Sequence, residues 1–61
     1  MTFEVVLSDE SIERVEGADN YAPEGPLTTF FDNQARPGGI SAWSVKVASY
    51  RTADIVRIRR R

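Results

Sequence analysis

The closing eleven residues, RTADIVRIRRR (Arg51–Arg61), decide the predicted fold. Five of them are arginine, so the segment admits two interpretations: a basic arm that binds a polyanion, or the last strand of a small sheet. RTAD predicts one tight turn, such as a single turn of 3₁₀ helix, and Val56 and Ile58 at alternate positions then predict a strand over Ile55–Arg60. The strand interpretation is favoured.

The opening residues supply a partner for this last strand. Thr2–Ser8 alternates between apolar and mixed positions, as a half-buried strand does, and its apolar side consists of Phe3, Val5 and Leu7. If the last strand pairs with the first, we expect Val56 and Ile58 to face inward against these residues. In small barrels such closure removes an edge that would otherwise invite aggregation.

The same pairing turns Arg57 and Arg59 outward beside Glu4. Opposite charges across neighbouring strands contribute about 0.2–1 kcal/mol per pair, and arginines on an edge also discourage pairing with another chain. Glu4 is the only acid of the first strand, so it cannot neutralise all the arginines of the last one. We therefore expect some positive charge to stay exposed.

The residues after the first strand predict a reversal. SDES (Ser8–Ser11) is rich in turn residues, and a second strand over Ile12–Glu16 would complete a hairpin. The rival is a short helix with Ser8 as its N-cap and Gly17 as its terminator. A helix of about eight residues is weak on propensity alone, so the hairpin is favoured.

The middle of the chain alternates breaks with strands. Two glycines and two prolines in Gly17–Pro26 predict a loop, and the aromatic and β-branched residues of Leu27–Asn33 predict a third strand. Gln34–Gly39 is the clearest break. Ile40–Tyr50 predicts a fourth strand, whose inner side would carry Trp43, Val45 and Val47.

These elements predict one all-β domain over residues 1–61. Five short antiparallel strands, with a long loop after the second and a one-turn break before the last, are similar in layout to an SH3-like small barrel. The aromatic residues mostly serve its core: we expect Trp43 and one of Phe30 and Phe31 inside, the other phenylalanine partly exposed or covered by the 17–26 segment, and Tyr50 near the surface.

Length and composition narrow the possible functions. A 61-residue chain without cysteine or histidine buries only about 60% of its unfolded surface, and it has no disulfides, thiolate chemistry or common zinc sites. Its carboxylates lack the spacing of a calcium loop and a pocket that would shift their pKa values. We expect no enzyme activity, cofactor, metal or small-molecule substrate. Without a signal peptide or membrane span, we expect a cytoplasmic location.

Charge is divided between the two halves of the chain. Residues 1–34 hold eight acids and one base, whereas residues 35–61 hold seven bases and one acid, so a net charge of −1 conceals halves of −7 and +6. Such halves attract each other within the fold or present faces to different partners. The leading hypothesis is a protein–protein interaction, self-association included, with these candidate residues: Glu10, Glu13, Glu16, Tyr21 and Tyr50.

The alternative hypothesis is nonspecific nucleic-acid binding, because guanidinium groups grip phosphate as a planar fork. The isoelectric point near 5.2 stands against it. A second alternative is a structural or oligomeric subunit of a larger particle. The nucleic-acid candidates are Arg57, Arg59, Arg60, Arg61, Lys46 and Arg36.

Two segments, EGADNYAPEGPLTTFF (residues 16–31) and WSVKVASYRTADIVRIRR (residues 43–60), resemble a group of short uncharacterised proteins of actinobacteria and their phages. In that group an acidic alternating N-terminus precedes a Tyr, Pro-Gly, Thr-Phe-Phe stretch and a basic final strand. The resemblance implies a cytoplasmic accessory role, in the host cytoplasm if the protein is phage-encoded. It implies no site residues.

Overall fold

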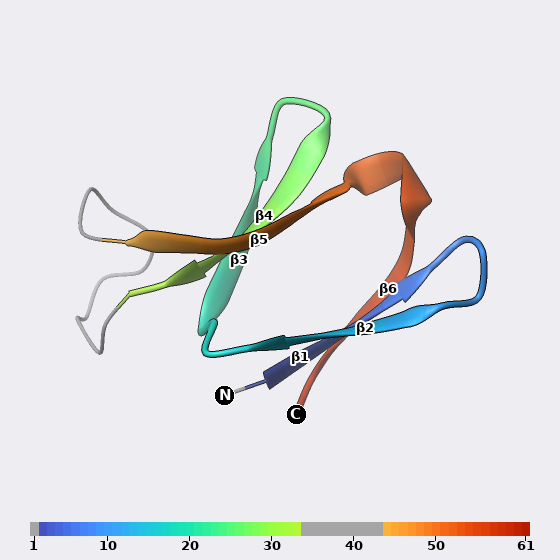
Figure 1. The fold of residues 1–61 in the computed structure, drawn as a ribbon. Coiled ribbons are helices and arrows are strands. Elements are labelled where there is room, and N and C mark those ends of the chain that lie inside the picture. The colour runs from blue at the N-terminus through green and yellow to red at the C-terminus, as the bar shows by residue number, and fades with distance from the viewer. Residues whose placement is uncertain (1, 34–43) are drawn as a thin grey trace.

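The computed structural model describes residues 2–33 and 44–61, and these form two three-stranded antiparallel sheets (Figure 1). We call β2-β1-β6 the first sheet and β3-β4-β5 the second sheet. The elements are β1 (Thr2–Leu7), β2 (Ile12–Glu16), β3 (Asn20–Glu24), β4 (Leu27–Asp32), β5 (Val45–Arg51), the 3₁₀ turn η1 (Thr52–Asp54) and β6 (Ile55–Arg60). The all-β prediction is confirmed. The described residues contain six strands rather than five, and the ladders form two sheets instead of one closed barrel.

The hairpin of β1 and β2 is confirmed over the short helix. Its strands pair so that Glu4 lies opposite Arg14. The turn between them is closed by the amide of Glu10, which donates to the carbonyl of Leu7 at 2.9 Å, and the side chain of Asp9 accepts a 2.9 Å hydrogen bond from the amide of Ser11. Glu10 has a φ of 71°, a left-handed conformation that suits glycine better than glutamate.

The prediction of a loop over Gly17–Pro26 is wrong for the middle of that segment, which forms the strand β3. Asn20–Glu24 pairs with β4, and Pro23 lies opposite Thr28. A proline can occupy this place because β3 is an edge strand of the second sheet, where its missing N–H need not reach a neighbouring strand. The turn that follows contains Gly25 at a φ of 57°, which explains the glycine there.

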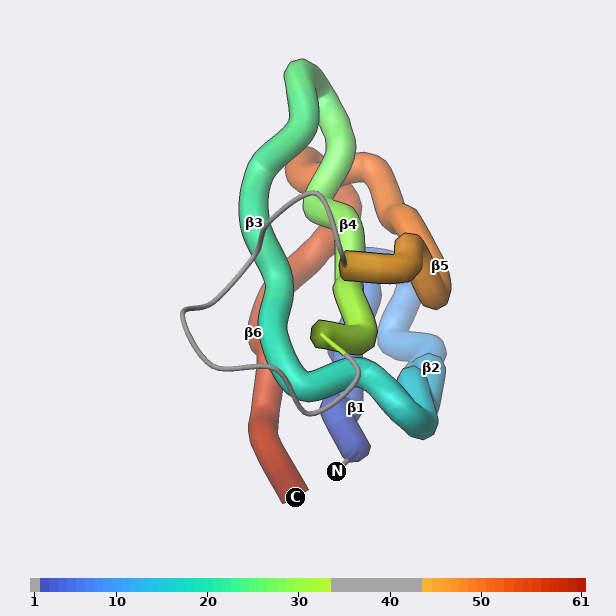
Figure 2. The backbone as a smooth tube through the Cα atoms, turned by 90° about the vertical axis from the view of Figure 1, so that its left-hand side faces the viewer, coloured from blue at the N-terminus to red at the C-terminus, as the bar shows by residue number. Residues whose placement is uncertain are grey.

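The predicted pairing of the last strand with the first is confirmed, with one error of phase. Ile58 lies opposite Val5 and packs against the core, but Val56 is 68% exposed. The register shifts between Val6 and Leu7, so Val56 is an extra residue at a bulge and Ile55 takes the inner position. The predicted 3₁₀ turn before this strand is present. The two ends of the chain therefore lie together (Figure 2). The Arg61 amide donates to the Thr2 carbonyl at 2.7 Å.

β5 faces the core with the opposite side from the one predicted. Val45 and Val47 are 46% and 41% exposed, whereas Ala48 and Tyr50 pack against the core. A second register shift, between Phe30 and Phe31 on the neighbouring strand, makes Val47 an extra residue, so the alternation changes phase before Ala48. The predicted Gln34–Gly39 break, the start of this strand from Ile40, and Trp43 all lie outside the described residues.

The core lies between the two sheets. Its buried residues are Phe3, Val5, Val15, Ala18 and Phe30. The ring of Phe3 packs against Phe30 at 5.3 Å between centroids and against Tyr21 at 5.4 Å, separations at which aromatic pairs attract each other. Phe31 on the other face of β4 is only 6% exposed, so of the two alternatives expected for the second phenylalanine, partial exposure is wrong and cover by another part of the chain remains.

The strained turn leads to a prediction about stability. Replacing Glu10 by glycine removes the cost of a left-handed conformation, about 1–2 kcal/mol, but increases the entropy of the unfolded chain. We expect Glu10→Gly to raise the free energy of unfolding by about 0.5 kcal/mol in denaturant titration. Ser8→Gly in the same turn is the control, because its φ is not positive, and it should lower stability. A decrease for both variants would contradict the strain argument.

Candidate interaction surface

The first sheet turns one face toward the core and the other toward solvent. Because strand residues alternate, the inward positions of Phe3 and Val5 place Glu4 and Val6 on the other side. We call that side the outer face. It carries Thr2, Glu4 and Val6 of β1, Ile12, Arg14 and Glu16 of β2, and Arg57 and Arg59 of β6, with Val56 at the bulge and Arg61 after the last strand.

Two aliphatic side chains of this face are exposed to an unusual degree. Ile12 is 62% exposed and Val56 is 68% exposed, the two highest values among the exposed large hydrophobic residues described. They lie near each other along the sheet: Ile12 pairs with Val6, and Val56 is the bulge residue next to Arg57, which pairs with Val6 from β6. Apolar side chains therefore cross the sheet from one edge strand to the other.

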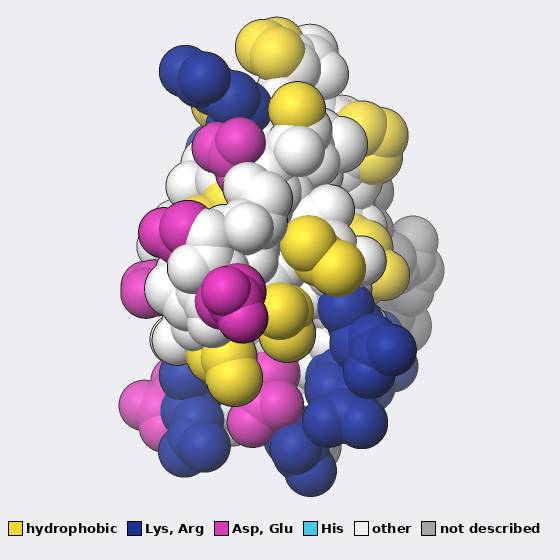
Figure 3. Space-filling model, turned by 90° about the vertical axis from the view of Figure 1, so that its right-hand side faces the viewer, with side chains coloured by type: hydrophobic (Ala, Val, Ile, Leu, Met, Phe, Trp, Pro, Cys, Tyr) yellow, Lys and Arg dark blue, Asp and Glu magenta, His cyan; other side chains and the backbone are white. Residues whose placement is uncertain are grey.

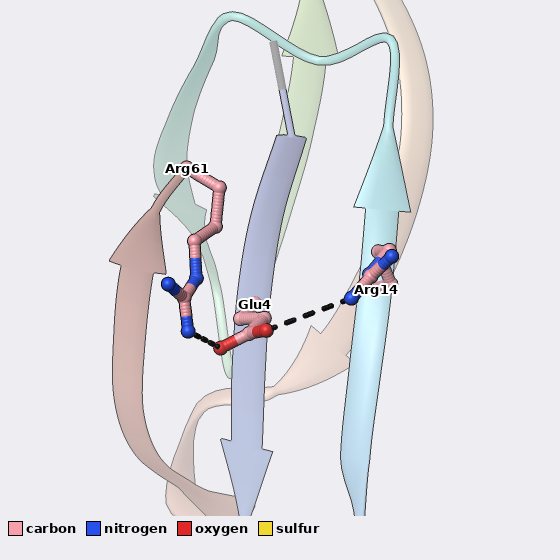
Figure 4. Close-up of polar contacts among 3 residues, drawn as sticks. All are labelled: Glu4, Arg14 and Arg61. Carbon is pink, nitrogen blue, oxygen red and sulfur yellow. Dashed lines mark hydrogen bonds and ion pairs between the residues drawn. The ribbon is translucent and has the colours of Figure 1, made fainter.

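Glu4 lies at the centre of the charged part of the outer face (Figure 4). Its Oε1 accepts a hydrogen bond from Nη2 of Arg61 at 3.1 Å, and its Oε2 lies 3.8 Å from Nη2 of Arg14. Two bases thus share one carboxylate. Both arginines are more than half exposed, so each contact contributes at most about 1 kcal/mol.

The arginines of β6 differ in what they contact. Arg59 lies opposite Glu4 and Arg57 opposite Val6, but the ion pairs predicted for them are made by Arg14 and Arg61 instead. Among the described residues Arg57 and Arg59 form no ion pair within 4 Å. Arg60 faces the other way, with its guanidinium carbon 5.2 Å from the centre of the Phe3 ring. The predicted surplus of positive charge is thus carried by Arg57 and Arg59.

The acidic candidates lie at the opposite edge of the first sheet. Glu13 and Glu16 are exposed on β2, and Glu10 is exposed in the turn before it. In Figure 3 most of the basic side chains gather at the lower right, acidic side chains lie mostly to the left, and hydrophobic side chains are exposed between them. The sheet therefore has an edge that is mainly acidic and an edge that is basic.

The two tyrosine candidates both contact core phenylalanines, but only Tyr50 is half-buried, whereas Tyr21 stays exposed. Tyr21 is 40% exposed, yet its ring contacts Phe3 and Phe30. Tyr50, expected near the surface, is half-buried and packs edge-on against Phe30 at 6.0 Å. Burial, together with the negative charge of Glu13, raises the pKa of the Tyr50 hydroxyl.

Two predicted nucleic-acid contacts do not join the arginines of β6 in the described structure. Lys46 is on the second sheet, where its Nζ lies 3.0 Å from Oε2 of Glu24. Arg36 lies outside the described residues. Sequence reasoning did not name Arg14 as a site residue. The predicted hairpin could have indicated it, because Arg14 lies opposite Glu4 there.

The described residues, 2–33 and 44–61, contain no pocket and no group of three or more acids that could hold a metal ion. Within the same ranges no helix is long and apolar enough to cross a membrane. The candidate functional sites in the described residues are therefore surfaces, and the outer face is the main one.

Comparisons with protein-family models, curated proteins and solved structures find no match to this chain. The resemblance to short proteins of actinobacteria and their phages therefore stays a prediction.

The second sheet generates a prediction about pH. The Thr29 hydroxyl donates to Oε1 of Glu24 at 2.7 Å, and this bond, followed by the hydrogen bond and charge of Lys46, lowers the pKa of Glu24 below its ordinary value of 4.5. A carboxyl whose pKa is lower in the folded state stabilises the fold above pH 4.5, and the stabilisation is lost as the pH falls through the folded pKa.

We therefore expect Thr29→Val to reduce the free energy of unfolding more at about pH 6 than at about pH 3. Thr28→Val is the control, because the Thr28 hydroxyl bonds to that of Thr52 at 2.8 Å instead of to a carboxylate. Its effect should be independent of pH. Denaturant titrations at both pH values measure the difference, and equal pH dependence for the two variants would contradict the assignment.

Proposed function

We propose that this chain is a non-enzymatic protein-binding module that acts through the outer face of its first sheet. The observation that carries the proposal is the exposure of Ile12 and Val56 at 62% and 68%. Burying a fully exposed side chain of this kind is worth roughly 1.5–3 kcal/mol. A partner that covers both side chains gains much of that free energy from each of them.

The surroundings of these side chains favour a protein over a nucleic acid. The named residues of the outer face include no aromatic side chain on which a base could stack. Arginine is instead enriched in protein interfaces, and Arg57 directly follows the exposed Val56. The free charges of Arg57 and Arg59 favour a partner segment with acidic residues.

The finer description of the fold belongs to the same proposal. An SH3-like arrangement is supported by the 3₁₀ turn before β6 and by the pairing of β6 with β1. The proposed place of action is the cytoplasm, and an accessory role fits a module of this size.

A peptide selection tests the proposal. The immobilised chain is offered a random peptide library, and we expect the retained peptides to share an apolar residue next to acidic residues. Loss of Ile12 and Val56 removes the apolar contact, so Ile12→Ser with Val56→Ser should weaken binding of a retained peptide at least tenfold by calorimetry.

The matched control is Val45→Ser with Val47→Ser, which alters two exposed aliphatic residues of the second sheet. This variant should bind the peptide as the unaltered chain does. A selection without any common pattern, or peptides that bind equally to the Ile12→Ser, Val56→Ser variant, would overturn the proposal.

Nucleic-acid binding is the second candidate, favoured by the unpaired guanidinium groups of Arg57 and Arg59 in the described structure. Each phosphate contact contributes about −0.9 to the slope of log K against log salt concentration. Two free arginines therefore predict a shallow slope of about −2 on duplex DNA, with weak binding. Fluorescence anisotropy at several salt concentrations measures this slope. A slope of about −4 or steeper that is lost in Arg57→Ser with Arg59→Ser would favour nucleic acid over protein as the partner.

A further inference from the structure

We propose that the protein partner is a second copy of this chain, and that the β2 edge of one copy adds to the β6 edge of the next. The inference rests on the proposed function and names its partner. In the described structure β2 and β6 are the two edge strands of the first sheet. The backbone groups along the outer edge of such strands have no strand to pair with, and an extended segment can add there by main-chain hydrogen bonds.

The two edges carry opposite charge. β2 and the turn before it hold Asp9, Glu10, Glu13 and Glu16 against Arg14. β6 holds three arginines and no acid. Two β6 edges would repel each other, and so would two acidic edges. Repulsion between like edges thus leaves the pairing of β2 with β6 as the favoured combination.

The apolar residues of the outer face align in this arrangement. β2 and β6 both run antiparallel to β1, so they run in the same direction, and a copy shifted sideways continues the sheet with its outer face on the same side. Val6 pairs with Ile12 on one side and with Arg57 on the other, and Val56 is the bulge residue next to Arg57. The shifted copy therefore brings its Ile12 beside Val56 and covers the two most exposed aliphatic side chains together.

The same alignment determines which charged residues of the two copies approach each other. Glu16 lies at the level of Thr2, whose carbonyl bonds to the Arg61 amide, so Glu16 of the added copy approaches Arg61. Arg14 lies at the level of Glu4 and Arg59, so it is the one residue that meets a like charge. Removing this base, as in Arg14→Ser, should strengthen the association.

The predicted assembly has recognisable properties. Different surfaces of each copy meet, so the contact is heterologous and further copies can add at both ends. An edge contact buries little area, which predicts weak association. Its mass should therefore rise with protein concentration and fall with salt, since salt screens exposed charges.

Sedimentation velocity on charge-reversed variants tests the inference. Arg57→Glu with Arg59→Glu makes both edges acidic, and Glu13→Lys with Glu16→Lys makes both edges basic. Each variant alone should stay monomeric at concentrations where the unaltered chain associates. An equimolar mixture should associate again, because every acidic edge then meets a basic one, and this recovery shows that both variants are folded.

The control for net charge is Lys46→Glu with Arg51→Glu, which changes the charge as much as the double arginine variant but lies on the second sheet. This control should associate like the unaltered chain. Loss of its association, a mixture no heavier than its components, or an unaltered chain that is monomeric at all concentrations would overturn the inference. If the selected peptides still bind through Ile12 and Val56, the proposed function stands with a different partner.

Discussion

The antiparallel pairing of β6 with β1 is the contact on which the rest of this structure depends. It joins the two ends of the chain, and the Arg61 amide reaches the Thr2 carbonyl at 2.7 Å. It also brings Ile58 against Val5 in the core. Because the paired residues are far apart in the chain, this ladder forms only after a large loop closes, at a cost in entropy that its packing must offset.

One irregularity within that ladder creates the candidate surface. The register shift between Val6 and Leu7 inserts Val56 as an extra residue, so Ile55 enters the core contact and Val56 is exposed. Bulges bend and twist a strand and thereby redirect its side chains. Without the shift, strict alternation would turn Val56 toward the core with Ile58 and would turn Ile55 outward.

The central position of β1 explains how opposite charges are distributed. Glu4 on β1 lies between β2 and β6. Its carboxylate contacts Arg14 of β2 on one side and Arg61, which follows β6, on the other. One carboxylate with two bases cannot also serve Arg57 and Arg59. The remaining acids of the first sheet are on and before β2, and β1 separates that edge from the basic one. The division of charge seen along the sequence thus becomes a division across one sheet.

The amino-acid sequence by itself determined the all-β class, the first hairpin, the 3₁₀ turn and the pairing of the first and last strands, because period-two alternation and turn residues act locally. The surplus of positive charge on the last strand also followed from counting. Only the tertiary structure decided that Pro23 lies in an edge strand, that Val56 is exposed and that Tyr50 turns inward. Edge position and bulges depend on the neighbouring strand, and a one-residue shift in register reverses the face of every side chain that follows.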